Sequence, residues 1–335
     1  MNVQVQRIQM RVSERLPRVV AHADWGVGAA KRWVAVALLG PEGRYRALAP
    51  RPVGRDGGVL ERLGVPGGDP RGGVVLGFDF PIGLPRRYAE LVGIDEFRPA
   101  LAGFGEGRWA AFYEVAAARE QIGLYRPFYP LTAGVKGERA RWHLHQALGL
   151  GAGELLRRCD RQGAEALFWT LGGRQVGKAA IDGWRTVLAP ALRDPELEVA
   201  LWPFDGELGE LVTPGRVVVA ETWPRECYRH LGLSFAPTRD SRHPSKRRQA
   251  DRRRNAPALL AWAAATGTEL APELAAAIGD GFGAGPGGED PFDAVAGLLG
   301  MVNVLLGRRP EGVPAGDEAV RRVEGWILGM APSAG

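Results

Sequence analysis

The stretch GGVVLGFDFPIGLP, Gly72 to Pro85, decides how this chain is expected to fold. Its residues Val74 to Phe78 are apolar without polar alternation, which is typical of a strand buried on both faces in the middle of a parallel sheet. Asp79 ends the strand, and a Pro-Ile-Gly-Leu-Pro turn follows directly. Such an Asp either accepts hydrogen bonds from its own turn or serves as a functional group.

The N-terminal part of the chain repeats this arrangement. A strand over Arg18–Asp24 also ends on an Asp, and a hairpin links the strands Arg32–Leu39 and 44–50. A short helix over 58–64 then leads to the strand Val74–Asp79, giving the order β-β-β-α-β. A right-handed crossover returns this fourth strand beside the first. Because functional groups of open α/β sheets gather at the carboxyl ends of the strands, we expect Asp24 and Asp79 to be neighbours.

The rest of the chain predicts a helical insertion at about 86–195, which would form a wall or lid over this edge of the sheet. Strand character returns at 196–204 and at 216–222, where Glu221 lies near the strand end. Three helices are expected at the end of the chain, over 245–266, 272–278 and 289–306. We therefore expect an α/β fold in one domain over 18–330, after a ragged or disordered N-terminus over 1–17.

The composition of the 335 residues, with 45% apolar and 24% charged side chains, is typical of a soluble globular protein. The two cysteines match no metal-binding spacing and indicate a reducing compartment. The N-terminus lacks the apolar core of a signal peptide, and the longest apolar stretch, Ala294–Gly307, is too short to span a bilayer. We expect a cytoplasmic protein without membrane contact.

The positive charge is concentrated in Arg239–Arg254, which carries eight Lys or Arg against two Asp. The whole chain has a formal charge of +5, so the remainder is nearly neutral. A basic patch of this kind suits the phosphates of nucleic acid, although a solvated helix face would show the same pattern. The candidate nucleic-acid contacts are Lys246, Arg247, Arg248, Arg252 and Arg253.

Asp290 and Asp293 are three residues apart at the start of the last predicted helix and share one of its faces. Taken alone, this pair would be explained by helix capping. Together with Asp24, Asp79 and Glu221, however, it predicts a cluster of carboxylates that repel one another unless divalent cations bind. Oxygen ligands without His or Cys favour Mg²⁺ or Mn²⁺, and we expect two ions about 3.5–4 Å apart, as in metal-dependent phosphodiester hydrolysis.

Five motifs carry a resemblance to a known family. In chain order they are AHADWG, VVLGFDFPIGLP, VVVAETWPRECYRHLG, SKRRQADRR and GGEDPFDAVAGLL. They resemble the motifs of the predicted RNase H-like nuclease family known as domain of unknown function 429. The match spans about 18–306, the insertion contributes little to it, and FDFPIGLP is its most specific element.

The resemblance implies an RNase H-like mixed sheet and a metal-dependent nuclease that acts on DNA or RNA. It places metal-binding acids at Asp24, Asp79, Asp290 and Asp293, similar to the helix-borne acids of RuvC-type resolvases. Glu221 matches the strand-borne acid of an E-x-x-P motif, which makes it a fifth ligand. The motif EDPFDA carries an additional acid, Glu289, and ETWPRE has a Trp where the family pattern has a His.

Two other functions fit parts of the sequence. DWGVGAAK resembles the first phosphate loop of actin-like and sugar-kinase-like phosphotransferases, with Lys31 as a phosphate contact. That class needs a second Asp-x-Gly hairpin, and GDGFGAGPGG has the residues without a preceding strand. Lys178 in GRQVGK is a second candidate phosphate contact, although the Walker spacing is lacking. The remaining alternative is a catalytically silent nucleic-acid-binding module of the same fold.

Overall fold

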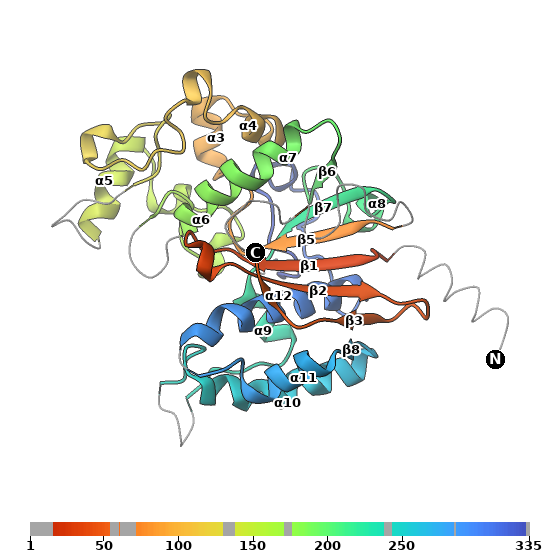
Figure 1. Cartoon of the computed structure of the whole chain (residues 1–335). Helices are drawn as coiled ribbons and strands as arrows, with labels where there is room; N and C mark the ends of the chain where they lie inside the picture. The colour runs from red at the N-terminus through yellow and green to blue at the C-terminus, as the bar shows by residue number, and fades with distance from the viewer. Residues whose placement is uncertain are drawn as a thin grey trace.

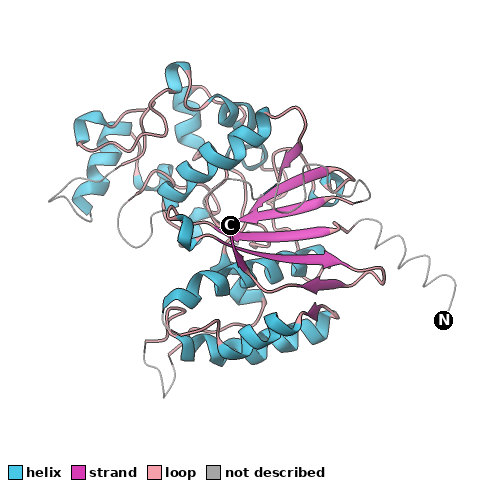
Figure 2. Ribbon diagram, in the orientation of Figure 1, coloured by secondary structure: helices cyan, strands magenta, loops and turns pink. Residues whose placement is uncertain are grey.

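The computed structural model describes residues 16–53, 60, 72–129, 138–170, 176–237, 243–284 and 286–332. The predicted helix over 58–64 lies outside the described residues except for Leu60. Nearly all of the N-terminal segment 1–17 and the basic residues Arg239 and Arg242 also lie outside them. The chain forms an α/β structure with helices on both faces of a mixed sheet (Figure 1, Figure 2). Among the described residues, no helix combines the length and apolar character needed to cross a bilayer.

The described strands form one sheet in the order β6-β7-β5-β1-β2-β3-β8, with β4 also paired to β2. Strands β6, β7, β5 and β1 are parallel, and β2 is antiparallel to β1 and β3. The predicted hairpins and the return of the fourth predicted strand beside the first are therefore confirmed. The strands are β1 Val19–Asp24, β2 Trp33–Leu39, β3 Tyr45–Ala47, β4 Arg51–Pro52, β5 Val74–Phe78, β6 Glu198–Leu201, β7 Arg216–Glu221 and β8 Glu269–Leu270.

Helices from the insertion cover one face of the sheet, and helices from the C-terminal part cover the other (Figure 1). The first group comprises α3 Arg86–Val92, α4 Phe97–Gly103, α5 Glu138–Leu148, α6 Val176–Gly183 and α7 Ala189–Arg193, and α8 Leu208–Leu211 precedes β7. The second group comprises α9 Pro224–His230, α10 Gln249–Thr266, α11 Pro272–Asp280 and α12 Glu289–Leu305.

The central strands pack against apolar side chains on both faces. In β5, Leu76 joins the core shared with the insertion, whereas Val75 joins the core shared with the C-terminal helices. The prediction that this strand is covered on both faces is confirmed. Helix α12 lies at the centre of the core shared with the C-terminal helices, and all its residues from Pro291 to Val304 are buried. A helix that is apolar on every side is stable only in such a position.

Candidate functional site

Asp24 and Asp79 lie side by side at the carboxyl ends of β1 and β5. The two strands are parallel and pair Ala23 with Phe78, so the next residue of each is an aspartate at the same edge of the sheet. Asp79 is half-buried, and its Oδ1 accepts a hydrogen bond from the backbone N–H of Trp25 at 2.7 Å. The predicted neighbourhood of the two acids is confirmed.

The turn after Asp79 is held by the C-terminal part of the chain. Gly83 has φ +136°, and a Cβ there would lie 2.0 Å from the carbonyl oxygen of Glu324, so only glycine fits. The N–H of Leu84 donates to the carbonyl of Val323 at 2.9 Å. The Pro-Ile-Gly-Leu-Pro turn is thus fixed from outside, and the chain that leaves Asp79 has a defined path.

Helix α12 brings the second pair of acids to the same edge because it packs very closely on β1. The His22 ring contacts Gly297 so tightly that a Cβ there would lie 2.3 Å from the ring, and His22 Nδ1 donates to the carbonyl oxygen of Ala294 at 3.1 Å. This packing places the first turns of α12, with Asp290 and Asp293, within electrostatic range of Asp24. The structure therefore brings together four of the predicted acids.

The electrostatics of this group, here called the acid cluster (Asp24, Asp79, Asp290 and Asp293), reflect burial and mutual repulsion. Burial raises the pKa of Asp24 well above its usual range, and the charges of the other three aspartates raise it further. Burial also raises the pKa of Asp79, partly offset by hydrogen bonds from Trp25 and from Asp24. The hydrogen bond between the Asp24 and Asp79 side chains lowers the pKa of Asp79, against the effect of burial.

Two side chains hold the Asp293 carboxylate. The Tyr228 hydroxyl donates to its Oδ1, and Lys246 Nζ forms an ion pair with its Oδ2. Lys246 Nζ also lies 3.1 Å from Glu289 Oε1. Burial raises the pKa of Asp293, whereas the ammonium of Lys246 lowers it. Lys246 was predicted only as a nucleic-acid contact, but in the structure it supplies a positive charge to the acid cluster.

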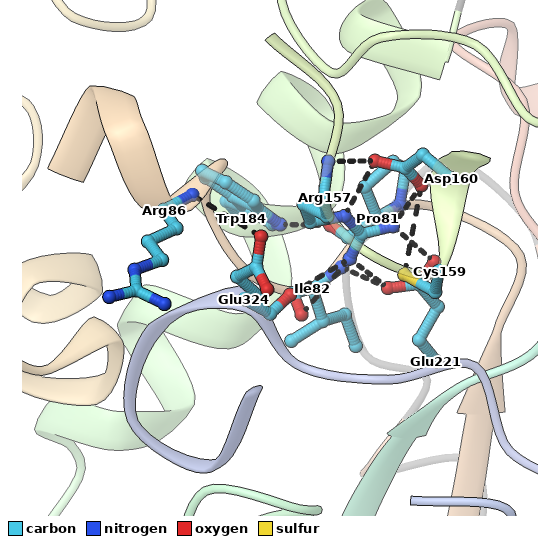
Figure 3. Close-up of polar contacts among 9 residues, drawn as sticks. All are labelled: Pro81, Ile82, Arg86, Arg157, Cys159, Asp160, Trp184, Glu221 and Glu324. Carbon is cyan, nitrogen blue, oxygen red and sulfur yellow. Dashed lines mark hydrogen bonds and ion pairs between the residues drawn. The ribbon is translucent and has the colours of Figure 1, made fainter. Parts of the chain in front are cut away.

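Glu221 is engaged elsewhere. Its Oε2 accepts the N–H of Ile82 at 2.7 Å, and the two terminal nitrogens of Arg157 donate to its two oxygens (Figure 3). Arg157 is fully buried and also forms two hydrogen bonds with the carboxylate of Asp160. The structure does not direct Glu221 at the acid cluster, so its role as a fifth metal ligand stays a prediction. What it visibly does is anchor the turn that follows Asp79.

The predicted nucleic-acid contacts separate into exposed and buried side chains. Arg247, Arg248 and Arg253 are exposed. Arg252, in contrast, is only 1% exposed and donates to the carbonyl oxygens of Gly281 and Gly283 at 2.7 and 2.8 Å. Its predicted position on the surface is wrong, because the guanidinium joins the start of α10 to the end of α11.

The two candidate phosphate contacts occupy different elements. Lys31 is exposed at the end of the 3₁₀ turn Ala29–Lys31, and its charge lowers the pKa of Asp290, against the effect of burial. Lys178 is half-buried on α6, one turn before Asp182. Asp182 accepts hydrogen bonds from Trp25 Nε1 at 2.9 Å and from Arg32. The insertion therefore packs directly on the loop that follows Asp24.

Sequence reasoning did not assign roles to His22, Tyr228, Gly297 and Arg157. A signal for His22 was present, because a polar residue within the apolar strand VVAHAD needs a buried partner. Gly297 could be suspected only once α12 was known to cross β1. Tyr228 and Arg157 reach the site from distant parts of the chain, and no local pattern indicates them.

Comparison with known protein families, curated proteins and solved structures finds no significant match for this chain. In the part of the chain that the structure describes, no group of three or more His, Cys, Asp or Glu side chains is spaced to hold a metal ion as the side chains stand. The chemistry of the acid cluster nevertheless suits a hard divalent cation, since it offers carboxylate oxygens and already contains one cation, the Lys246 ammonium.

Proposed function

We propose that this chain is a divalent-metal-dependent nuclease with an RNase H-like fold. The observation that carries the proposal is the convergence of Asp24, Asp79 and Asp293 from β1, β5 and α12 at one edge of the sheet. Like-charged side chains that are buried together cost free energy, and a bound cation removes that cost. The resemblance of five motifs to the RNase H-like nuclease family supports the same function.

Each group of the site has a separate task in this proposal. Asp24, Asp79, Asp290 and Asp293 would hold Mg²⁺ or Mn²⁺, and their four charges match two ions. The bound ions would activate a water molecule and stabilise the leaving oxygen of a phosphodiester. Trp25 orients Asp79 through its N–H, and Tyr228 orients Asp293 through its hydroxyl.

The basic segment supplies the nucleic-acid contacts. Arg247, Arg248 and Arg253 are exposed in the same segment as Lys246, which reaches the acid cluster. Phosphates bound by these side chains would therefore lie close to the acids. Since phosphate contacts act without base recognition, we expect DNA or RNA to bind with little sequence preference.

The phosphotransferase alternative receives less support. GDGFGAGPGG follows the helix α11 rather than a strand, and the described strands belong to one sheet. A duplicated sheet with a second phosphate loop has no counterpart among them. A catalytically silent binding module would have the same acids and is distinguished from a nuclease by the cleavage measurement described next.

Thermal melts of the parent and Asp79→Asn, with and without Mn²⁺, test the proposal. Without metal, Asp79→Asn should be at least as stable as the parent, because it removes one charge from a crowded cluster. Mn²⁺ should raise the Tm of the parent and have much less effect on the variant. Cleavage of a mixed set of DNA and RNA should fall by several orders of magnitude in the variant, if the chain is an active nuclease.

Asp205→Asn is the matched control. Asp205 Oδ2 accepts the N–H of Leu201 at 2.7 Å, as Asp79 accepts that of Trp25. Asp205 lies in the turn after β6, outside the acid cluster, and pairs with Arg98 at 3.3 Å. If the role of Asp79 is purely structural, Asp79→Asn should lower the free energy of unfolding by about 1 kcal/mol, and Mn²⁺ should affect the parent and Asp79→Asn equally. That result would reject the metal site. A metal effect without cleavage would support the silent binding module.

A further inference from the structure

Lys246 is positioned to be both a counter-charge for the acids and a ligand for phosphate. Its Nζ is paired with Asp293 and with Glu289, while 38% of its side chain remains exposed. The residue that follows, Arg247, pairs with Glu289 at 3.3 Å and is 72% exposed. The ammonium of Lys246 thus faces the acid cluster, and the next residue, Arg247, faces solvent.

Hydrogen bonds hold the backbone around Lys246, whereas the ammonium at the end of its side chain is held by ion pairs with Asp293 and Glu289. The N–H of Ser245 donates to Asp251 Oδ2 at 2.8 Å, and the N–H of Arg248 donates to the carbonyl of Ser245 at 2.9 Å. The buried Arg252 donates to the carbonyl oxygen of Lys246. A lysine side chain has four rotatable bonds, so its ammonium can move away from Asp293 while this backbone turn stays in place.

We propose that Lys246 is a tethered cation that competes with the divalent metal ion for Asp293, and that a nucleic-acid phosphate draws it away. Metal binding and nucleic-acid binding then strengthen each other. This inference rests on the proposed function and adds its regulation: the metal site reaches full affinity only when nucleic acid is present. A metal-loaded site without substrate would be disfavoured.

The competition follows from charge and geometry. An ammonium paired with Asp293 both occupies one of its oxygens and cancels part of the negative charge that attracts a cation. A phosphate that pairs with Lys246 removes both effects. Both Mn²⁺ and nucleic acid therefore bind more tightly when the Lys246 side chain is turned away from Asp293 than when it is paired with Asp293. Thermodynamic reciprocity requires that Mn²⁺ also raises the affinity for nucleic acid by the same factor.

Calorimetric titration of the full chain with Mn²⁺ tests the inference in the parent, Lys246→Met and Arg247→Met. Without nucleic acid, Lys246→Met should bind Mn²⁺ about 10-fold more tightly than the parent, a factor typical of coupled sites. Arg247→Met removes one positive charge from the same turn but leaves the pair between Lys246 and Asp293 intact, so it should bind Mn²⁺ much as the parent does. Lys246→Arg retains the cation and should also resemble the parent.

The titrations are then repeated with a saturating phosphorothioate DNA 12-mer of mixed sequence, which keeps the backbone charge and resists hydrolysis, and the heat of Mn²⁺ binding to the 12-mer alone is subtracted. The 12-mer should increase the Mn²⁺ affinity of the parent and leave that of Lys246→Met unchanged. Equal or weaker Mn²⁺ binding by Lys246→Met without DNA, or the same response to DNA in both proteins, would overturn the inference.

Asp79→Asn, titrated in parallel, separates this inference from the function on which it rests. Mn²⁺ binding that depends on Asp79 but not on Lys246 would overturn the competition and leave the metal-dependent nuclease in place. Mn²⁺ binding that does not depend on Asp79, or no Mn²⁺ binding by any of these proteins, would overturn both.

Discussion

Arg157 and Glu221 form a buried ion pair in which each of the two terminal nitrogens of the guanidinium donates to a different carboxylate oxygen (Figure 3). Arg157 also donates to the carbonyl of Ile82 at 3.3 Å, and Glu221 accepts the N–H of the same residue at 2.7 Å. The pair therefore binds both backbone groups of one residue in the turn after Asp79. It connects the insertion, β7 and that turn without reaching the acid cluster.

Arg157→Met should lower the free energy of unfolding by about 3–5 kcal/mol, because it leaves the charges of Glu221 and Asp160 buried without their partner. Glu221→Gln should cost less, since Arg157 keeps its two hydrogen bonds with Asp160. Denaturant unfolding of both variants measures the difference. Because Glu221 is paired with Arg157 and not directed at the acid cluster, Glu221→Gln should retain the Mn²⁺-induced rise in Tm. A loss of that rise in Tm would indicate that Glu221 is a metal ligand.

The close contact of Gly297 with His22 gives a second prediction. Gly297→Ala places a Cβ 2.3 Å from the His22 ring, so α12 has to move away from β1. Overpacking of this kind costs about 1–3 kcal/mol. Because the shift also carries Asp293 away from Asp24, the Mn²⁺-induced rise in Tm should decrease, which thermal melts with and without Mn²⁺ would show.

Gly279→Ala on α11 is the control for this substitution. A Cβ at Gly279 meets nothing within 4 Å, so the variant should be as stable as the parent or more stable by about 0.5–1 kcal/mol. It should also respond to Mn²⁺ as the parent does. An equal loss of stability and of Mn²⁺ response in both variants would contradict the assignment of the effect to the contact between Gly297 and His22.

The sheet could be predicted from sequence because its determinants are local. Unbroken apolar runs such as Val74–Phe78 identify strands covered on both faces, and the right-handed crossover rule places β5 beside β1. Boundaries set by tertiary contacts were less accurate. The basic helix was predicted from Ser245 but begins at Gln249, because Ser245 and Lys246 are held in a turn by Asp251 and Arg252.

The candidate site likewise has features that the sequence predicts and features that it does not. The neighbourhood of Asp24 and Asp79 follows from strand order alone, so it was predictable. The partner of Glu221 was not, since Arg157 lies 64 residues away in the predicted helical insertion, and no sequence pattern indicates that its side chain reaches β7. The burial of Arg252 was not predictable either, because a run of basic residues does not reveal which of them faces the core.

The half-buried His230 predicts a decrease in stability at mildly acidic pH. Trp262 Nε1 donates to Asn303 Oδ1 at 2.9 Å, so the Asn303 amide nitrogen, 3.0 Å from His230 Nδ1, donates to that ring nitrogen. Burial and, to a smaller extent, the charge of Arg309 lower the pKa of His230 to about 4. Glu226 pairs with Arg309. His230 is therefore neutral in the folded protein at neutral pH.

Between pH 6.5 and about 4 the unfolded chain binds a proton at His230 that the folded chain does not. This contribution to stability is complete above pH 6.5 and is lost as the pH falls, by about 3 kcal/mol in total. Denaturant unfolding at intervals across this range should show the loss in the parent. His230→Gln should show a smaller one, since the other titrating groups are unchanged. Identical pH dependence in both proteins would contradict the assignment.

The exposed arginines and the buried Arg252 should respond differently to substitution. If Arg247 and Arg248 contact phosphates, the double change to Ala should weaken the binding of all sequences similarly and reduce the slope of log affinity against log salt by about one unit per lost contact. Arg252→Ala should instead lower the free energy of unfolding, because it leaves the carbonyl oxygens of Gly281 and Gly283 without their donor. Fluorescence anisotropy of labelled DNA at several salt concentrations, together with denaturant unfolding, separates the two effects. An unchanged salt slope in the double variant would mean that nucleic acid does not bind at this segment, and the proposed release of Lys246 by phosphate would then have no source.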